Sequence, residues 1–182
     1  MLLRMDDIRE EGLALTLDEA VEKLPQLIQI SGAGECVFTA PLHVSLRAMR
    51  VGEMVEVEGS VATVVRLVCS RCLQEFETPL ESRFALTFAR EVPRVTEEEG
   101  DEEVELEAED LGLVIFSGDE IDLSDSIQEQ VIMALPMRPL CREECRGLCP
   151  QCGADLNQAT CGCAPPVSLG KFAALKDFKV DK

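Results

Sequence analysis

Cysteine spacing is the feature of this sequence that points most directly to chemistry. Eight of the nine cysteines form four short-range pairs, numbered here in chain order: Cys69 and Cys72, Cys141 and Cys145, Cys149 and Cys152, Cys161 and Cys163. A structural zinc site takes four thiolate or imidazole ligands in a tetrahedron, and it usually collects them as pairs from tight turns. The four pairs therefore predict two structural zinc ions per chain.

Spacing alone leaves the division of the pairs between the two sites open. In one scheme the third and fourth pairs form a local ribbon, and the first pair joins the second across a long stretch of sequence. In another scheme the second and third pairs bind one metal together. The ninth cysteine, Cys36, has no close neighbour in sequence and is predicted to be a small buried hydrophobe.

Residues that could support catalysis are scarce. The chain has a single histidine, His43, which lies far from the cysteine pairs. A catalytic zinc site keeps one position open for water, and the sequence offers few residues for such a mixed site. It also shows no Ser/His/Asp set and no glycine-rich phosphate loop. We therefore expect a protein that is not an enzyme, with His43 on the polar face of a strand.

Composition is typical of a folded protein of the cytoplasm. The chain has 182 residues, of which 46% are hydrophobic, and it contains neither Trp nor Tyr, so the core must be largely aliphatic. No stretch has the length and apolar character of a membrane span, and residues 1–10 do not resemble a secretory signal. In a reducing compartment, clustered cysteines are more often metal ligands than disulfides.

Negative charge is concentrated in the middle of the chain. The formal net charge is -18, and residues 95–137 carry 15 acidic groups and no basic group. The densest run, residues 97–110, cannot bury enough apolar surface to offset its self-repulsion. We expect an acidic flexible loop, which either keeps the protein soluble or attracts a basic partner such as a ribosomal protein.

The first third of the chain predicts short strands. Residues 13–17 alternate between apolar and smaller or polar side chains, which is typical of a strand, and Asp18 is placed to cap a brief helix that ends near Pro25. A further strand is expected over residues 35–47. Alternation within this strand puts His43 on its polar face.

Residues 54–88 predict a β-hairpin with the first cysteine pair at its tip. A β-branched segment runs into Cys69, and Gly59 would allow a bend or bulge in it. The return strand has five apolar residues of the same parity: Phe76, Leu80, Phe84, Leu86 and Phe88. A Cys-x-x-Cys turn at a hairpin tip is a zinc knuckle, which supplies half of a site.

The remaining regular elements follow the acidic run. Residues 111–116 predict a short strand, and Asp122 is placed to cap a helix that Pro136 ends. The helix has one apolar face, made of Leu123, Ile127, Val131 and Ala134. In the later CPQCG run, Gly153 can adopt the positive φ that a zinc knuckle requires.

Together these elements indicate an α+β protein with a mostly antiparallel β-sheet, one main helix and a cysteine-rich, metal-stabilised C-terminal segment. We expect a β-rich domain over residues 1–94 and the acidic loop over residues 95–110. A strand and a helix over residues 111–140 should complete the domain. A zinc-ribbon-like segment and tail should occupy residues 141–182.

Five features occur in a fixed order along the chain: the CSRC hairpin, the acidic middle, the helix ending ALPMRPLC, the run CRGLCPQCGADLN and a tail containing KFAALKDF. Through them the chain resembles the YceD family of large ribosomal RNA subunit accumulation proteins over roughly residues 13–178, most sharply at the first cysteine pair and at residues 146–157. The resemblance implies a non-enzymatic role in accumulation of large-subunit ribosomal RNA. It also implies a bacterial gene neighbourhood that includes a large-subunit ribosomal protein.

Five arginines lie close in sequence to the cysteine pairs: Arg66, Arg71, Arg138, Arg142 and Arg146. If the pairs converge in space, these side chains would form a basic patch suited to a phosphate backbone or an acidic surface. Ordinary solvation, or pairing with the acidic loop, is the alternative. The expected partner is a large ribosomal subunit precursor, contacted through its RNA or through a basic ribosomal protein, with no membrane and no small-molecule substrate.

Two other classes of function also fit the cysteines. A zinc ribbon that binds nucleic acid shares the CPxCG knuckle, although such ribbons usually bring the basic and aromatic surface that this chain lacks. A redox-sensing adaptor would release zinc when its thiolates are oxidised.

Overall fold

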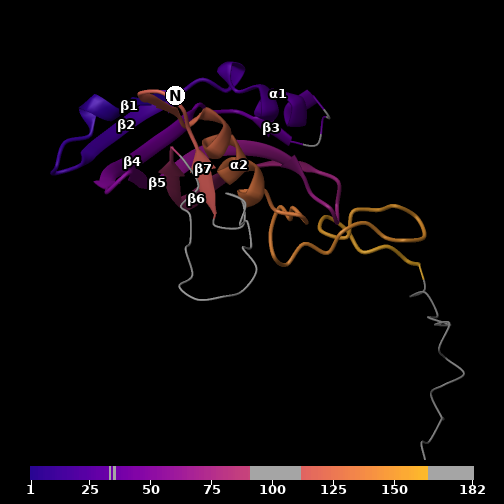
Figure 1. Ribbon diagram of the computed structural model, residues 1–182. Helices are drawn as coiled ribbons and strands as arrows, with labels where there is room; N and C mark the ends of the chain where they lie inside the picture. The colour runs from indigo at the N-terminus through magenta and orange to yellow at the C-terminus, as the bar shows by residue number, and fades with distance from the viewer. Residues whose placement is uncertain (33, 35, 91–111, 164–182) are drawn as a thin grey trace, which may run out of the picture.

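The structure is a computed structural model in which residues 1–32, 34, 36–90 and 112–163 are described. It consists of a curved β-sheet, two helices that pack against the sheet, and a cysteine-rich arm, residues 137–163, at one end (Figure 1). The strands are β1 (Leu2–Arg4), β2 (Leu13–Glu19), β3 (Cys36–Phe38), β4 (Leu42–Val51), β5 (Met54–Val68), β6 (Glu75–Ala89), β7 (Leu113–Ile115) and β8 (Glu120–Asp122). The helices are α1 (Pro25–Gly32) and α2 (Ser124–Ala134), with 3-10 turns η1 (Met5–Asp7) and η2 (Val21–Lys23).

The main sheet has six strands in the order β2-β4-β5-β6-β7, and β3 pairs with β5 beyond the end of β4. All of its pairs are antiparallel except β6 with β7. A second, two-stranded sheet joins β1 to β8. The predicted fold class, a mostly antiparallel sheet with helix and a cysteine-rich C-terminal segment, is confirmed, and the structure adds α1 as a second helix.

The hairpin of β5 and β6 positions the arm. Its strands pair without interruption from Met54 opposite Ala89 to Val68 opposite Glu75, so the first cysteine pair lies at the far end of a long two-stranded ribbon. The β-branched residues of β5 suit this extended backbone. Gly59 forms no bulge, because it lies opposite Leu46 in the continuous register of β4 and β5. A Cβ at this position would overlap the carbonyl oxygen of Ser45. Glycine is therefore needed for close strand packing.

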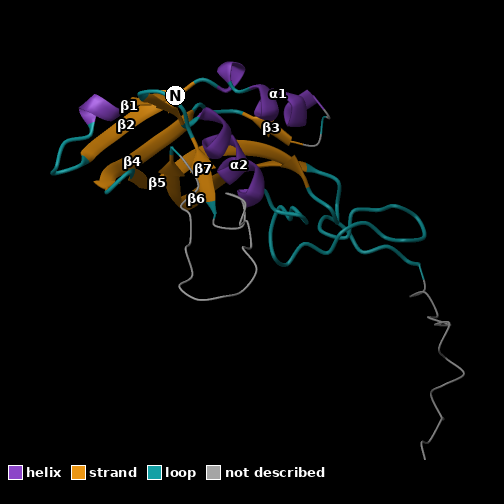
Figure 2. Cartoon of the chain, viewed as in Figure 1, coloured by secondary structure: helices purple, strands orange, loops and turns teal. Residues whose placement is uncertain are grey.

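The core lies between one face of the sheet and the two helices (Figure 2). Alternate residues of β4 and β5 are buried, as the period-two pattern predicted, and all five same-parity residues of β6 pack into or against this core. From α2, the predicted apolar face contributes Leu123, Ile127 and Val131, which are buried. Gln128 is also buried, and its side chain accepts a hydrogen bond from the backbone amide of Gln26, which ties α1 to α2.

Three local predictions were wrong. Asp18 caps no helix, because β2 continues to Glu19 and pairs Asp18 with His43 of β4. Pro25 begins α1 instead of ending a helix, since the first helical turn does not need its missing N–H. The strand expected over residues 35–47 is two strands, β3 and β4, interrupted before Leu42 at a segment that contains proline.

The cap of α2 is shifted by one residue. The N-cap position is Leu123, while the Asp122 side chain accepts a hydrogen bond from the amide of Ser124 at 2.9 Å. None of the described helices has both the length and the apolar character needed to cross a bilayer. The acidic loop predicted over residues 95–110 and the tail after residue 163 lie outside the described residues.

Candidate metal centres

The structure brings the eight paired cysteines into two groups of four. The first cluster contains Cys69, Cys72, Cys141 and Cys145, and the second contains Cys149, Cys152, Cys161 and Cys163. Within each cluster all the sulfur atoms lie within 4.8 Å of one another. This is the first of the two pairing schemes left open by the sequence, in which one site is local and the other spans the chain.

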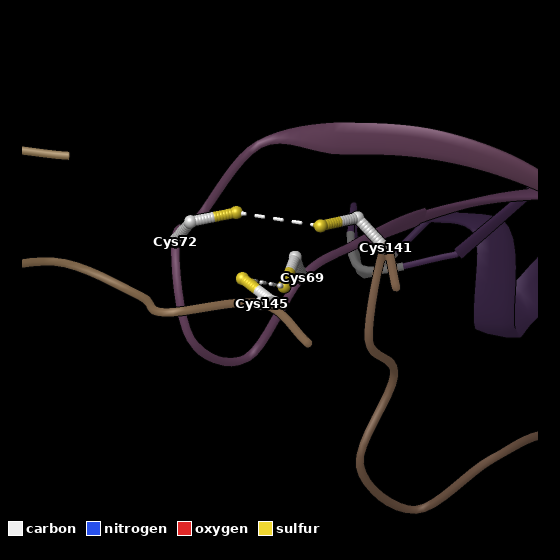
Figure 3. Close-up of side chains that lie close together, drawn as sticks. All are labelled: Cys69, Cys72, Cys141 and Cys145. Carbon is white, nitrogen blue, oxygen red and sulfur yellow. Dashed lines mark hydrogen bonds between the residues drawn. The ribbon is translucent and has the colours of Figure 1, made fainter. Parts of the chain in front are cut away.

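The first cluster forms where the hairpin tip meets the start of the arm, residues 137–163. Figure 3 shows Cys69 facing Cys145 and Cys72 facing Cys141. The sulfur–sulfur distances in these two pairs are 3.8 and 3.7 Å. All nine cysteines are free thiols. Cys69, Cys72 and Cys145 are buried, and Leu140, Leu148 and Phe76 pack against them. The cluster is thus a small core of its own at the end of the sheet.

Backbone hydrogen bonds shape the knuckle at the hairpin tip. The amide of Cys69 donates to the carbonyl of Gln74, and the amide of Leu73 donates back to the carbonyl of Cys69, both at 2.9 Å. This turn gives Leu73 a φ of 60°, the sole positive φ at a non-glycine residue in the described chain. In the second cluster the equivalent position is Gly153, with a φ of 72°, as the sequence predicted.

Contacts from the hairpin tip hold the arm in place. The amide of Ser70 donates to the carbonyl of Pro139 at 2.8 Å, and the amide of Leu148 donates to the carbonyl of Arg71 at 3.0 Å. The guanidinium of Arg71 donates to the carbonyls of Glu143 and Cys145 at 3.1 and 2.9 Å. Arg71 therefore holds the backbone of the first cluster in place.

The second cluster is built within fifteen residues of the arm. The amide of Cys149 donates to the carbonyl of Ala154 at 2.8 Å, and the amide of Gly153 donates back to the carbonyl of Cys149 at 2.9 Å. A single bridge pairs Leu148 with Asp155, and the rest of the arm is loop (Figure 2). Cys149 is buried, whereas Cys152 is exposed, so this cluster is the more open of the two.

Both clusters suit a tetrahedral zinc ion. Zinc–thiolate bonds of about 2.3 Å in a tetrahedron place the sulfur atoms about 3.8 Å apart. Two sulfur pairs of the first cluster have this spacing, and all sulfur atoms in each cluster lie within 4.8 Å of one another. Four thiols and no fifth ligand position make a closed, structural set of donors. The two clusters could therefore hold two structural metal ions.

The thiol pKa values show what such an ion would supply. Burial opposes ionisation of Cys69, but three backbone amides aimed at its sulfur lower the pKa of Cys69 to about 6. Backbone amides likewise lower the pKa of Cys149 to about 6. Burial, reinforced by the neighbouring thiols, raises the pKa of Cys141 to about 12, and contact with Cys152 together with burial raises the pKa of Cys163 to about 12. In the first cluster burial also opposes ionisation of Cys145, but a hydrogen bond from Asn157 and the amide of Gly147 lower the pKa of Cys145. Each cluster thus combines thiols of lowered and raised pKa, and a divalent cation would compensate the charge of the remaining thiolates.

The five predicted contact arginines are all exposed, but they differ in their partners. Arg66 forms an ion pair with Glu77 across the hairpin at 3.0 Å. Arg142 and Arg146 flank the backbone segment that Arg71 binds, so these three lie around the first cluster. Within the described residues, neither these three nor Arg138 has a carboxylate within ion-pairing distance.

The other two candidate residues lie away from the clusters. His43 is exposed on β4 and its Nδ1 lies 2.7 Å from a carboxylate oxygen of Asp18. Cys36 is buried in the main core, where desolvation raises the pKa of its thiol. Both therefore occupy the structural positions that the sequence predicted.

Comparison with known proteins assigns the chain to a family. The sequence profile described as large ribosomal RNA subunit accumulation protein YceD matches residues 57–179, more than half of the chain, including both clusters. The chain belongs to the YceD family. The name of this family refers to accumulation of large ribosomal subunit RNA.

Curated relatives of this YceD-family chain occur in bacteria and plants. An uncharacterised Mycobacterium tuberculosis protein is 38% identical over 119 residues, covering 64% of this chain and 52% of that protein. An uncharacterised Mycobacterium leprae protein is 34% identical over 156 residues, with 81% and 63% covered. The Arabidopsis thaliana protein named large ribosomal RNA subunit accumulation protein YCED homolog 1, chloroplastic, is 29% identical over 140 residues, with 68% and 44% covered.

The chain spans about half the length of the curated relatives that it matches. No solved structure matches this YceD-family sequence.

Some structural residues of the site were missed by the sequence analysis. Gly147 has a φ of 71° and packs against the backbone of Arg71. The side chain of Asn157 donates a hydrogen bond to the sulfur of Cys145 at 3.4 Å. A glycine two residues after Cys145 was a usable signal, since Gly153 was recognised one residue after its own cysteine. Local spacing does not mark Asn157 as a contact of Cys145, because Cys145 lies 12 residues away.

Proposed function

We propose that this YceD-family protein is a non-enzymatic factor that supports accumulation of large-subunit ribosomal RNA, and that two structural zinc ions hold its arm in shape. Family membership supports the ribosomal role. The observation that carries the zinc assignment is the gathering of eight cysteines into two groups of four, each with its sulfur atoms within 4.8 Å of one another. In a reducing cytoplasm, where we place the protein, such clusters stay available to metal.

The absence of enzymatic activity is part of the proposal. A catalytic zinc ion keeps one coordination position for water or substrate, whereas each cluster supplies a full set of four sulfur donors. His43 pairs with an exposed carboxylate on the outer face of the sheet. The metals thus act by fixing the arm, since the arm has little apolar core of its own.

The arm is the proposed contact surface for ribosomal RNA. Arg71, Arg142 and Arg146 lie around the first cluster, and Arg138 precedes it. All four are exposed, and in the described part of the chain none has a carboxylate within ion-pairing distance. Arginine guanidinium groups in such a position suit phosphate oxygens. We further propose that the acidic segment of residues 97–110 attracts a basic ribosomal protein.

The cellular test is the ratio of large- to small-subunit ribosomal RNA after depletion of the protein. We expect the ratio to fall, and to be restored by the wild-type chain but not by Cys69→Ser/Cys72→Ser. A ratio that does not fall would count against the ribosomal role. Full rescue by the cysteine variant would show that the role does not need the first cluster.

The contact surface is tested by charge reversal. Arg142→Glu/Arg146→Glu should abolish association with large-subunit precursors while the chain stays folded. Arg50→Glu/Arg83→Glu is the matched control, because Arg50 on β4 and Arg83 on β6 lie exposed outside the arm and their reversal changes the net charge equally. This variant should leave association intact. Equal loss of association in both variants would attribute the effect to net charge and would rule out the arginines of the arm as the contact surface.

A redox-sensing adaptor is the second candidate, and the exposure of Cys152 is the observation that favours it. An exposed zinc-bound thiolate is open to oxidation, which would release the metal. Mild peroxide should then release zinc from the second cluster first and change association with the partner in step. If the thiols do not react with peroxide, the redox candidate is rejected and the structural role of the metal ions remains.

A further inference from the structure

The two clusters are joined by a short segment and by one side chain. Cys145 of the first cluster and Cys149 of the second are separated by three residues. Asn157 belongs to the loop between Cys152 and Cys161 of the second cluster, yet its Nδ2 donates a hydrogen bond to the Cys145 sulfur at 3.4 Å. A residue carried by one cluster therefore contacts a ligand atom of the other.

The orientation of the Asn157 amide is fixed by its other hydrogen bonds. Its Oδ1 accepts from the backbone amide of Arg146 at 2.8 Å, so its Nδ2 must face the sulfur. Its own backbone amide and its Nδ2 both donate to Asp155 Oδ1, at 2.9 and 2.8 Å. With donor and acceptor both satisfied, the half-buried side chain is held in one rotamer.

Backbone contacts connect the same two segments to the hairpin. The amide of Leu156 donates to the carbonyl of Gly147 at 2.9 Å, and Leu148 pairs with Asp155. On its other side, the amide of Leu148 donates to the carbonyl of Arg71 in the first knuckle. These backbone bonds tie the loop of the second cluster to the segment that packs against the hairpin beside the first cluster.

We propose that the two metal sites bind metal cooperatively, with Asn157 as the positioning residue that couples them. A metal in the second cluster fixes both ends of the loop that carries Asn157, which presents Nδ2 to Cys145. A hydrogen bond to a thiolate is stronger than one to a neutral thiol, so the contact favours the metal-bound form of the first cluster. Coupling of this kind is reciprocal, so each metal raises the affinity for the other.

This inference rests on the zinc part of the proposed function and adds that neither site reaches full affinity alone. Outer-sphere partners of metal ligands typically change metal affinity by about tenfold or more. We therefore expect the affinity of the first cluster to be about tenfold higher when the second cluster is occupied. The relevant quantity is the metal affinity of each cluster in the full chain.

The test uses the full chain under reducing conditions, with cadmium as the probe. Each four-sulfur site gives its own cadmium NMR resonance, and a chelator of known affinity sets the free metal concentration. Cys149→Ser/Cys152→Ser removes the second cluster and assigns the resonance of the first. We expect that variant to bind cadmium at the first cluster about tenfold more weakly than the wild type.

Asn157→Ala should lower the affinity of the first cluster about tenfold in the intact chain, and should change it less than twofold in the Cys149→Ser/Cys152→Ser background. Asn157→Asp keeps the size and removes the donor, so it should weaken the first cluster at least as much. Thr160→Ala, an exposed position in the same loop, is the matched control and should change neither cluster. The second resonance in each Asn157 variant verifies that the loop still folds.

Three results would overturn the inference. Equal effects of Asn157→Ala with and without the second cluster would make Asn157 a local contact with no coupling role. If the metal affinity of the first cluster is unchanged in both Asn157→Ala and Cys149→Ser/Cys152→Ser, the two sites are independent, and the zinc proposal still stands. Failure of the wild-type chain to bind two metal ions would reject the zinc proposal and the coupling together.

Discussion

The close contact of Gly147 with the hairpin predicts that one methyl group will loosen the arm. Gly147 has a φ of 71°, and a Cβ there would lie 2.9 Å from the carbonyl oxygen of Arg71 and 3.2 Å from its Cβ. That carbonyl accepts the hydrogen bond from Leu148 that holds the arm. Gly147→Ala therefore forces both an unfavourable backbone conformation and a shift of a bonded carbonyl.

The expected cost follows from these two effects. The left-handed conformation costs an L-residue about 1–2 kcal/mol, and a weakened backbone hydrogen bond costs about 1 kcal/mol. The sum of about 2–3 kcal/mol lowers the free energy of opening the arm, which corresponds to a roughly 30- to 140-fold loss of amide-exchange protection. The loss should be confined to residues 69–74 and 145–157, because the main core does not involve the arm.

Two other glycines separate the contributions. Gly153 has a φ of 72° but no atom within 4 Å of a Cβ, so Gly153→Ala should incur the backbone cost alone. Gly162 has neither constraint, so Gly162→Ala should have no effect. Hydrogen exchange with mass spectrometry of the metal-loaded chains gives the ranking. Equal losses in the Gly147 and Gly153 variants would refute the packing of the arm against Arg71.

Removal of metal with a strong chelator should speed amide hydrogen exchange in residues 141–163 and leave exchange in β4, β5 and β6 slow, because the main core contains none of the eight clustered cysteines. Fast exchange throughout the chain would contradict this prediction. Leu73→Asn should raise the free energy of unfolding by about 0.5–1 kcal/mol, since asparagine tolerates positive φ better than leucine and Leu73 is 64% exposed. Thermal melting measures the change, and a lower melting temperature would count against strain at this knuckle. Asp122→Ala should lower the free energy of unfolding by about 1 kcal/mol, because it removes the acceptor for the Ser124 amide at the start of α2. Burial opposes ionisation of Asp122, but hydrogen bonds from Ser124 outweigh it and lower the pKa of Asp122. Its contribution is thus fully present above about pH 4 and is lost as the pH falls through the lowered folded-state pKa, so wild type and variant should converge in acid melts.

The sequence predicted the hairpin well because its information is local. In β5 and β6, alternating apolar residues fix which face is buried, and the turn residues between Cys69 and Cys72 fix where the strands end. Alternation also placed His43 on the polar face, whereas Cys36 was predicted to be buried because it has no cysteine neighbour close in sequence. These assignments need no knowledge of distant segments.

Predictions that depended on distant segments were less secure. Asp18 has the local propensity of a cap, but seven consecutive pairs between β2 and β4 outweigh it. The cysteine spacing predicted two sites, yet only the docking of the arm on the hairpin shows which pairs combine. Asn157 was missed for the same reason, because its role depends on the position of Cys145 in space. Arg71 was predicted as a contact residue, and the structure adds a scaffolding role.

The wide separation of the ligands of the first cluster has a consequence for synthesis of the chain. Cys72 and Cys141 are 69 residues apart in sequence, so the hairpin half of the site leaves the ribosome well before the arm half. At about 5–20 residues per second, the delay is roughly 3–14 s. During that interval the nascent hairpin carries two unpartnered thiols at its tip. Completion of the first cluster is therefore a late, C-terminal event, and a chain truncated before Cys141 would carry a finished hairpin but only half of its metal site.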